Sequence, residues 1–151
     1  MTKQNDMYEL LAEAVQNHGE NAVRNVLAEL AAKQDGSRIL TIVGNSGMHV
    51  IPEALIRGEL YTATHGTLDL SKGTSLAEIY IAILRPLADK LREKTWEKIY
   101  FIPTGPTTLS LQIKLLVYHI TRISTVDLYY ERGSYIEVDL DYRSYLFPQK
   151  E

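Results

Sequence analysis

One apolar run constrains the fold of this chain more than any other feature. Arg38-Ile39-Leu40-Thr41-Ile42-Val43 is almost continuously apolar and ends at Gly44. A strand with one solvent-facing side alternates apolar and polar residues, whereas a strand covered on both faces of a parallel sheet reads as a run of this kind. The run therefore predicts an α/β protein in which other layers cover a parallel sheet.

Strands and helices alternate in the residues that follow. We expect strands at residues 60–64, 98–102 and 125–130, a short helix around Pro52 to Arg57, a long helix after Ser75 and another over residues 109–120. Ser75 and Glu78 have the spacing of a capping box, and Pro86 should kink the long helix because it removes one backbone hydrogen bond. This order favours right-handed crossovers and a Rossmann-like, mostly parallel sheet with helices on both faces.

The stretch from Tyr135 to Tyr142 alternates cleanly between apolar and polar residues. This period predicts a half-buried strand at a sheet edge, with four side chains turned toward the core: Ile136, Val138, Leu140 and Tyr142. The opposite face carries Glu137, Asp139 and Asp141. Hard cations favour clustered oxygens, but we interpret these carboxylates as a solvated face that protects the edge. No metal site is expected.

The chain begins with a different pattern. Apolar residues at helical spacing on either side of Gly19 predict a helical hairpin over residues 5–34. We therefore expect two domains, the hairpin at residues 1–36 and a ligand-binding domain at residues 37–151. The hairpin is interpreted as a packing or dimerisation element, with a partner-docking module as the alternative.

Charge and composition exclude several functions. The chain has 151 residues, a net charge of −3 and no cysteine. A protein that grips long DNA or RNA by its phosphates usually carries a basic excess, so that class is disfavoured, while a small anionic ligand remains open. The absence of cysteine excludes thiolate metal sites and cysteine nucleophiles. No apolar run approaches membrane-spanning length and no signal sequence is visible, so we expect a cytoplasmic protein without a membrane partner.

Two loops at predicted strand ends are the candidate ligand-binding site. Ligands of parallel α/β sheets bind at the carboxyl ends of the strands, where the following helices start. The first loop, Gly44 to His49, combines two glycines with polar side chains; the second, Pro103 to Thr108, opens a helix whose free amides suit an anion. The ligand-binding candidates are Gly44, Asn45, Ser46, Gly47, His49, Thr104, Gly105, Thr107 and Thr108. The alternative interpretation is that neither loop binds a ligand and that both are ordinary strand-to-helix turns.

His65 follows a third predicted strand, at residues 60–64. A histidine in this position could act as a general acid or base, although a loop histidine more often has no catalytic role. The sequence identifies no nucleophile–base pair, and nothing in it requires a cofactor.

With these loops placed, the chain resembles the CRISPR-associated Rossmann-fold sensor domains, or CARF domains, over residues 38 to 140. The first-strand pattern of that family is similar to Ile39-Leu40-Thr41-Ile42-Val43-Gly44-Asn45-Ser46-Gly47. Its second hallmark, a strand followed by Thr-Gly-Gly-Thr-Lys and a helix, resembles the segment from Ile99 to Thr108. Pro106 and Thr108 stand where the family has its second glycine and its lysine.

The CARF resemblance implies a homodimer whose paired loops bind a cyclic oligoadenylate second messenger in antiviral signalling. Some relatives also cleave the ring without metal, by attack of the ribose 2′-hydroxyl on its own phosphodiester. The resemblance makes four residues candidates for that reaction: Ser46, His49, Thr104 and Thr107. Lys114 or Arg122 would have to supply the charge of the missing lysine.

A second resemblance competes with the first over residues 75 to 130. Leu84-Arg85-Pro86-Leu87, followed by Ile102-Pro103-Thr104-Gly105-Pro106, is similar to the opening of a caspase-like CHAT domain. The catalytic cysteine of that family is absent, and His65 lies upstream where the family has its histidine downstream. This resemblance implies a catalytically inactive relative or a structural interaction protein.

Overall fold

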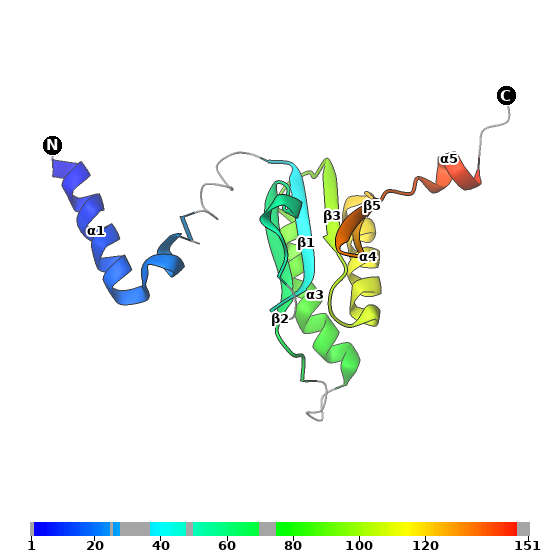
Figure 1. The fold of residues 1–151 in the computed structure, drawn as a ribbon, viewed down its shortest axis with the longest axis horizontal. Helices are drawn as coiled ribbons and strands as arrows, with labels where there is room; N and C mark the ends of the chain where they lie inside the picture. Colours follow the sequence, from blue (N-terminus) through cyan, green and yellow to red (C-terminus); the bar gives the residue numbers. More distant parts are fainter. Residues whose placement is uncertain (1, 25, 28–36, 48–49, 70–74, 148–151) are drawn as a thin grey trace. The chain divides into compact units, whose positions relative to one another are not determined.

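The structure is a computed structural model that describes residues 2–24, 26–27, 37–47, 50–69 and 75–147. The chain divides into two compact units, Met1–Ser37 and Arg38–Glu151. The helices and strands of both units are drawn in Figure 1.

The first unit is helical where it is described. Helix α1 spans Thr2–His18 and ends at Gly19, whose φ of +84° and amide hydrogen bond to the Val15 carbonyl are those of a C-terminal cap. Residues 20–24 and 26–27 are helical again. The predicted N-terminal helix is thus confirmed, and the rest of the predicted second helix lies outside the described residues.

The second unit is built on one five-stranded sheet in the order β2-β1-β3-β4-β5. Four strands run parallel: β1 (Ile39–Ser46), β2 (Glu59–His65), β3 (Lys98–Ile102) and β4 (Val126–Glu131). Strand β5 (Ser134–Val138) returns antiparallel beside β4. The predicted α/β class with a mostly parallel, Rossmann-like sheet is confirmed.

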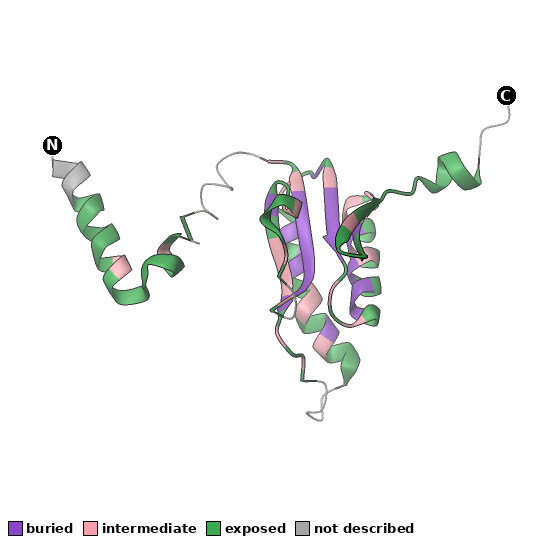
Figure 2. Ribbon diagram, in the orientation of Figure 1, coloured by how far each residue is buried: buried purple, intermediate pink, exposed green. Residues whose placement is uncertain are grey.

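The two faces of the sheet are covered unequally. Helices α3 (Leu76–Arg92) and α4 (Thr107–Thr121) pack on one face over a core of buried residues. The ribbon is purple in Figure 2 where residues are buried. That core comprises Leu40, Ile42, Tyr80, Leu87, Leu91, Trp96, Ile99, Phe101, Leu109, Ile113 and Val117. Both helices share a face because the steps from β2 to β3 and from β3 to β4 cross the sheet in the same direction, and right-handed crossovers then lie on the same side.

The step from β1 to β2 goes the other way, so its connection covers the opposite face. Among the residues of this connection that the structure describes, one turn of 3-10 helix, η1 (Glu53–Leu55), forms where a short helix was expected. Ile51 and Leu55 pack on the sheet, and the Arg57 guanidinium lies 4.6 Å from the centre of the Tyr100 ring.

A buried ion cluster joins β2 to the end of α3. The Glu59 carboxylate is buried, lies 2.5 Å from Lys90 Nζ and also binds Lys94. Burial works against ionisation of Glu59, but the hydrogen bonds from the two lysines outweigh it and hold its pKa below the ordinary 4.5. Both ammonium groups also lie over the Trp96 ring. The capping box of Ser75 and Glu78 starts α3, which continues through Pro86 to Arg92.

The predicted C-terminal strand is shorter and more exposed than expected. Strand β5 ends at Val138, and its apolar side chains Ile136 and Val138 are 45% and 38% exposed. The expectation that this face is buried was wrong because the strand turns its other face to the core: Tyr135 is half-buried and packs against a cluster that includes Val43, Tyr100 and Val126. Asp141 instead caps the short helix α5 (Tyr142–Leu146), and Glu137 pairs with Arg57 at 2.5 Å.

Candidate functional site

The strand order places a topological switch point between β1 and β3. The chain leaves β1 toward β2 over one face, whereas the connections that follow cross the other face. In open α/β sheets the two diverging connections leave a crevice at the carboxyl ends of the strands, and ligands bind there. The carboxyl ends of β1 and β3 lie side by side at this switch point.

A reciprocal pair of hydrogen bonds ties the end of β1 to the loop after β3. Strand β1 includes Gly44, Asn45 and Ser46, where the sequence predicted a loop. The main-chain amide of Asn45 donates to Thr104 Oγ1 at 2.8 Å, and the Thr104 hydroxyl donates to the main-chain carbonyl of Asn45 at 2.6 Å. A Cβ atom on Gly44 would lie 2.3 Å from the Thr104 carbonyl oxygen, and one on Gly105, where φ is +92°, would lie 2.9 Å from Asn45 Cβ. Glycine is therefore required at both positions for the loops to approach this closely.

The carboxyl end of β2 joins the same cluster. The Asn45 side-chain amide donates to the Gly66 carbonyl at 2.7 Å, and the Thr64 hydroxyl donates to the Gly44 carbonyl at 2.6 Å. Asn45 Oδ1 is buried and accepts no hydrogen bond from the described residues. A buried acceptor without a donor is costly, so this oxygen is suited to a donor group brought by a bound molecule or by water.

Ser46 and His65 meet at the ends of the two neighbouring strands. Ser46 Oγ lies 2.7 Å from His65 Nδ1, and the two residues are partners in the parallel β1–β2 register. The Gly66 amide donates to the Ser46 carbonyl at 2.7 Å, which fixes the main chain beside the pair. Sequence reasoning treated His65 as an isolated loop histidine. Its position directly after a predicted strand was the available signal, but the register was needed to pair it with Ser46.

The start of α4 supplies main-chain donors to the site. Pro106 is the N-cap residue, and the first intrahelical bond runs from the Ser110 amide to the Pro106 carbonyl at 3.1 Å. The amides of residues 107–109 precede that bond and are the donors that favour an anion at a helix start. Thr107 is exposed, whereas the Thr108 hydroxyl lies 2.6 Å from Tyr80 Oη and links α4 to α3.

The structure thus brings most of the sequence-predicted site residues to one edge of the sheet. They are Gly44, Asn45, Ser46, Gly47, Thr104, Gly105, Thr107 and Thr108. His49 lies outside the described residues.

The two cations considered as substitutes for the missing lysine lie elsewhere. Lys114 binds Asp127 on β4. Arg122 caps the opposite end of α4, about 22 Å along the helix from Thr107 at a rise of 1.5 Å per residue. The expectation that either would serve the Pro103–Thr108 loop was wrong, because each side chain belongs to a later part of α4.

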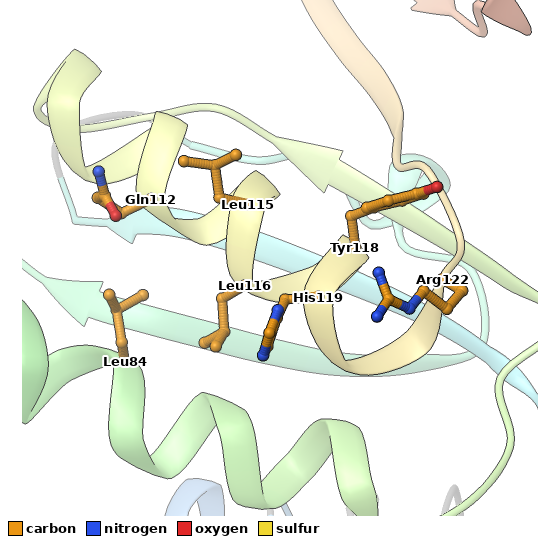
Figure 3. Close-up of a pocket in the computed structure, with 7 residues that line it drawn as sticks. All are labelled: Leu84, Gln112, Leu115, Leu116, Tyr118, His119 and Arg122. Atoms are coloured by element: carbon orange, nitrogen blue, oxygen red, sulfur yellow. The ribbon is translucent and has the colours of Figure 1, made fainter.

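An apolar groove lies on the helical side of the unit, away from the loops. It is a shallow, open groove of about 410 Å³ between α3 and the second half of α4. Figure 3 shows its lining residues, Leu84, Gln112, Leu115, Leu116, Tyr118, His119 and Arg122, with Leu116 and His119 directed toward α3. The groove shares no residue with the carboxyl-edge cluster.

Neither a metal centre nor a membrane-spanning helix is found in the described ranges of the chain. Within those ranges, no three histidine, aspartate or glutamate side chains are grouped so that they could hold a metal ion. Nor does any helix there have the length and apolar character needed to cross a bilayer. Comparison of the chain with models of known protein families, with curated proteins and with solved structures finds no match.

Proposed function

We propose that residues 38–147 bind a small anionic nucleotide at the carboxyl edge of β1, β2 and β3, with a cyclic oligoadenylate as the leading candidate. The observation that carries the proposal is the reciprocal bonding of Asn45 and Thr104 across the topological switch point. It holds two glycine loops rigidly at the position where sheets of this topology bind ligands. The CARF resemblance of the same two loops suggests the adenylate.

The chemistry of the site favours a phosphodiester over a polyphosphate. The amides at the start of α4 and the exposed Thr107 hydroxyl are donors for phosphate oxygens. Asn45 Oδ1 is an acceptor suited to an amino or hydroxyl group of a nucleoside. Residues 44–47, 64–66 and 103–108 contain no lysine or arginine, so one copy of the site supports little negative charge.

A second copy of the site would double these donors, and we propose that the protein acts as a homodimer. Exposed apolar side chains support association. Leu111, Leu115 and Tyr118 are 55%, 63% and 48% exposed on the outer side of α4, and the β5 side chains Ile136 and Val138 are also exposed. As the CARF resemblance implies, such a dimer would act in the cytoplasm in CRISPR-type antiviral signalling.

Thermal unfolding in the presence of cyclic oligoadenylates tests the binding. A ligand at 100 times its Kd stabilises the folded state by about 2.7 kcal/mol, which gives a clear rise in Tm. Thr107→Ala should weaken the shift, whereas Ser124→Ala, an exposed serine beyond the far end of α4, should leave it unchanged. No shift with any ring size, at concentrations well above micromolar, would overturn the proposal.

The exposed apolar surface also favours a second candidate function, a non-catalytic interaction protein of the caspase-like CHAT type. Tyr142, Tyr145, Leu146 and Phe147 are all more than 60% exposed in and just after α5. Patches of this kind mark protein-interaction surfaces. This candidate predicts no nucleotide response and loss of a captured protein partner when residues 139–151 are deleted, with the Tm of the remaining chain unchanged.

A further inference from the structure

The contact between Ser46 and His65 is a feature that nucleotide binding alone does not require. A serine hydroxyl 2.7 Å from an imidazole nitrogen has the geometry of a nucleophile beside its general base. Both side chains lie at the carboxyl ends of adjacent strands, which is where the proposed ligand binds.

The pair is held by the sheet and not by loop packing. Ser46 and His65 are partners in the strand register, and the Gly66 amide bonds the Ser46 carbonyl immediately after it. Asn45, which precedes Ser46, is buried and fixed on both sides by Thr104 and Gly66. A nucleophile and base positioned in this way lose little entropy on the way to the transition state.

The space beside the pair is open to a substrate. His65 is exposed and Ser46 half-buried. A Cβ atom at Gly66 would meet no heavy atom within 4 Å, so the described residues leave the space around Gly66, the residue after His65, open. The donor amides at the start of α4 belong to the loop that Thr104 ties to Asn45, so a bound phosphodiester would lie between those amides and the Ser46 hydroxyl.

We infer that Ser46 and His65 form a nucleophile–base pair that hydrolyses a phosphodiester bond of the bound nucleotide. This inference rests on the proposed function. It differs from attack by the ribose 2′-hydroxyl, because the protein itself supplies the attacking oxygen.

The reaction balances in two steps. In the first step Ser46 Oγ bonds to phosphorus and passes its proton to His65. The bond from phosphorus to one ribose oxygen breaks, and His65 returns the proton to that leaving oxygen. In the second step water attacks the phosphoserine diester and gives a proton to His65, and the Ser46 oxygen leaves and regains that proton. The net change is hydrolysis of a phosphodiester to a phosphomonoester and an alcohol.

The test incubates the full chain with cyclic tetraadenylate, cyclic hexaadenylate and, as a small probe, bis(4-nitrophenyl) phosphate. Products are resolved by liquid chromatography and mass spectrometry, and acid-quenched protein is mapped for an adduct on Ser46. Ser46→Ala and His65→Gln should each slow cleavage at least about 100-fold. The matched controls Ser124→Ala and His119→Gln, both exposed, should cleave at the wild-type rate.

The outcomes separate this inference from the proposed function. A linear phosphomonoester product and a Ser46 adduct in the wild-type chain, with cleavage lost in both variants, support the pair. A 2′,3′-cyclic phosphate product with full activity in Ser46→Ala overturns the inference. Ring binding without cleavage overturns it too, but leaves the proposed function standing. If neither ring binds, the proposed function fails, and the inference that rests on it fails too.

Discussion

Gly44→Ala should be among the most damaging single-methyl changes in the sheet, because Gly44 lies directly against the β3 loop. The added Cβ would lie 2.3 Å from the Thr104 carbonyl oxygen, whereas an ordinary contact begins at 3.4 Å. The two loops must therefore separate by about 1 Å or store the strain. Separation weakens both hydrogen bonds between Asn45 and Thr104, each worth about 1 kcal/mol, while overpacking in place costs about 1–3 kcal/mol. We expect a loss of about 2–3 kcal/mol in the free energy of unfolding.

Equilibrium unfolding in urea measures this loss, with Gly66→Ala as the matched control. At an m-value of about 1–3 kcal/mol/M, Gly44→Ala should lower the midpoint by about 1–2 M. Gly66 has a φ of +66° but open space around it, so its alanine variant carries only the cost of the left-handed backbone, about 1 kcal/mol. If Gly44→Ala costs no more than Gly66→Ala, the close approach of the two loops is not what requires glycine, and the reasoning is refuted.

Three further perturbations address the loop pairing, the helix cap and the buried ion cluster. Thr104→Val keeps the side-chain shape but leaves the Asn45 main chain unpaired, so stability in urea should fall by about 2 kcal/mol and Thr104→Ser should recover most of it. Ser75→Ala removes the cap of α3 and should cost about 1 kcal/mol; an unchanged midpoint would contradict the cap. Because the pKa of Glu59 is lowered in the folded state, its contribution is present above pH 4.5 and is lost as the pH falls through the folded value. Glu59→Gln should therefore make Tm fall less steeply as the pH is lowered into the acid range. If Tm falls as steeply in Glu59→Gln as in the wild-type chain, other carboxylates cause the acid unfolding.

The sequence predicts the elements of the sheet well because burial on both faces leaves a strong pattern. The run before Gly44 and the run from Lys98 to Ile102 become β1 and β3, the two strands at the centre of the core. The loop after β3 is recognisable from its proline and glycine residues. The predicted end of the first strand at Gly44 was wrong, because β1 continues through Gly44 and Asn45 to Ser46. Strand order carries no comparable signal, so the switch point itself emerges only from the structure.

The expectations that failed depend on neighbours distant in the sequence. The alternation in residues 135–142 indicates a strand, but it does not indicate whether another layer of the protein covers the apolar face. Ile136 on that face is exposed. The ion pair of Glu59 could not be predicted either, because its partner Lys90 is 31 residues away in the last turn of α3. The contact of Ser46 with His65 likewise depends on the β1–β2 register, which neither strand specifies alone.

The two hydrogen bonds between Asn45 and Thr104 also determine how much of the chain must be synthesised before the site can form. The two residues are 59 positions apart, and Asn45 and Gly66 are 21 apart, so the cluster closes only after β3 has docked beside β1. Contacts at such separations form late because chain closure must come first. A nascent chain that has left the ribosome only as far as α3 would carry β1 and β2 but no completed crevice. Under the proposed function, the ligand would therefore be bound only by a chain in which β3 has docked beside β1.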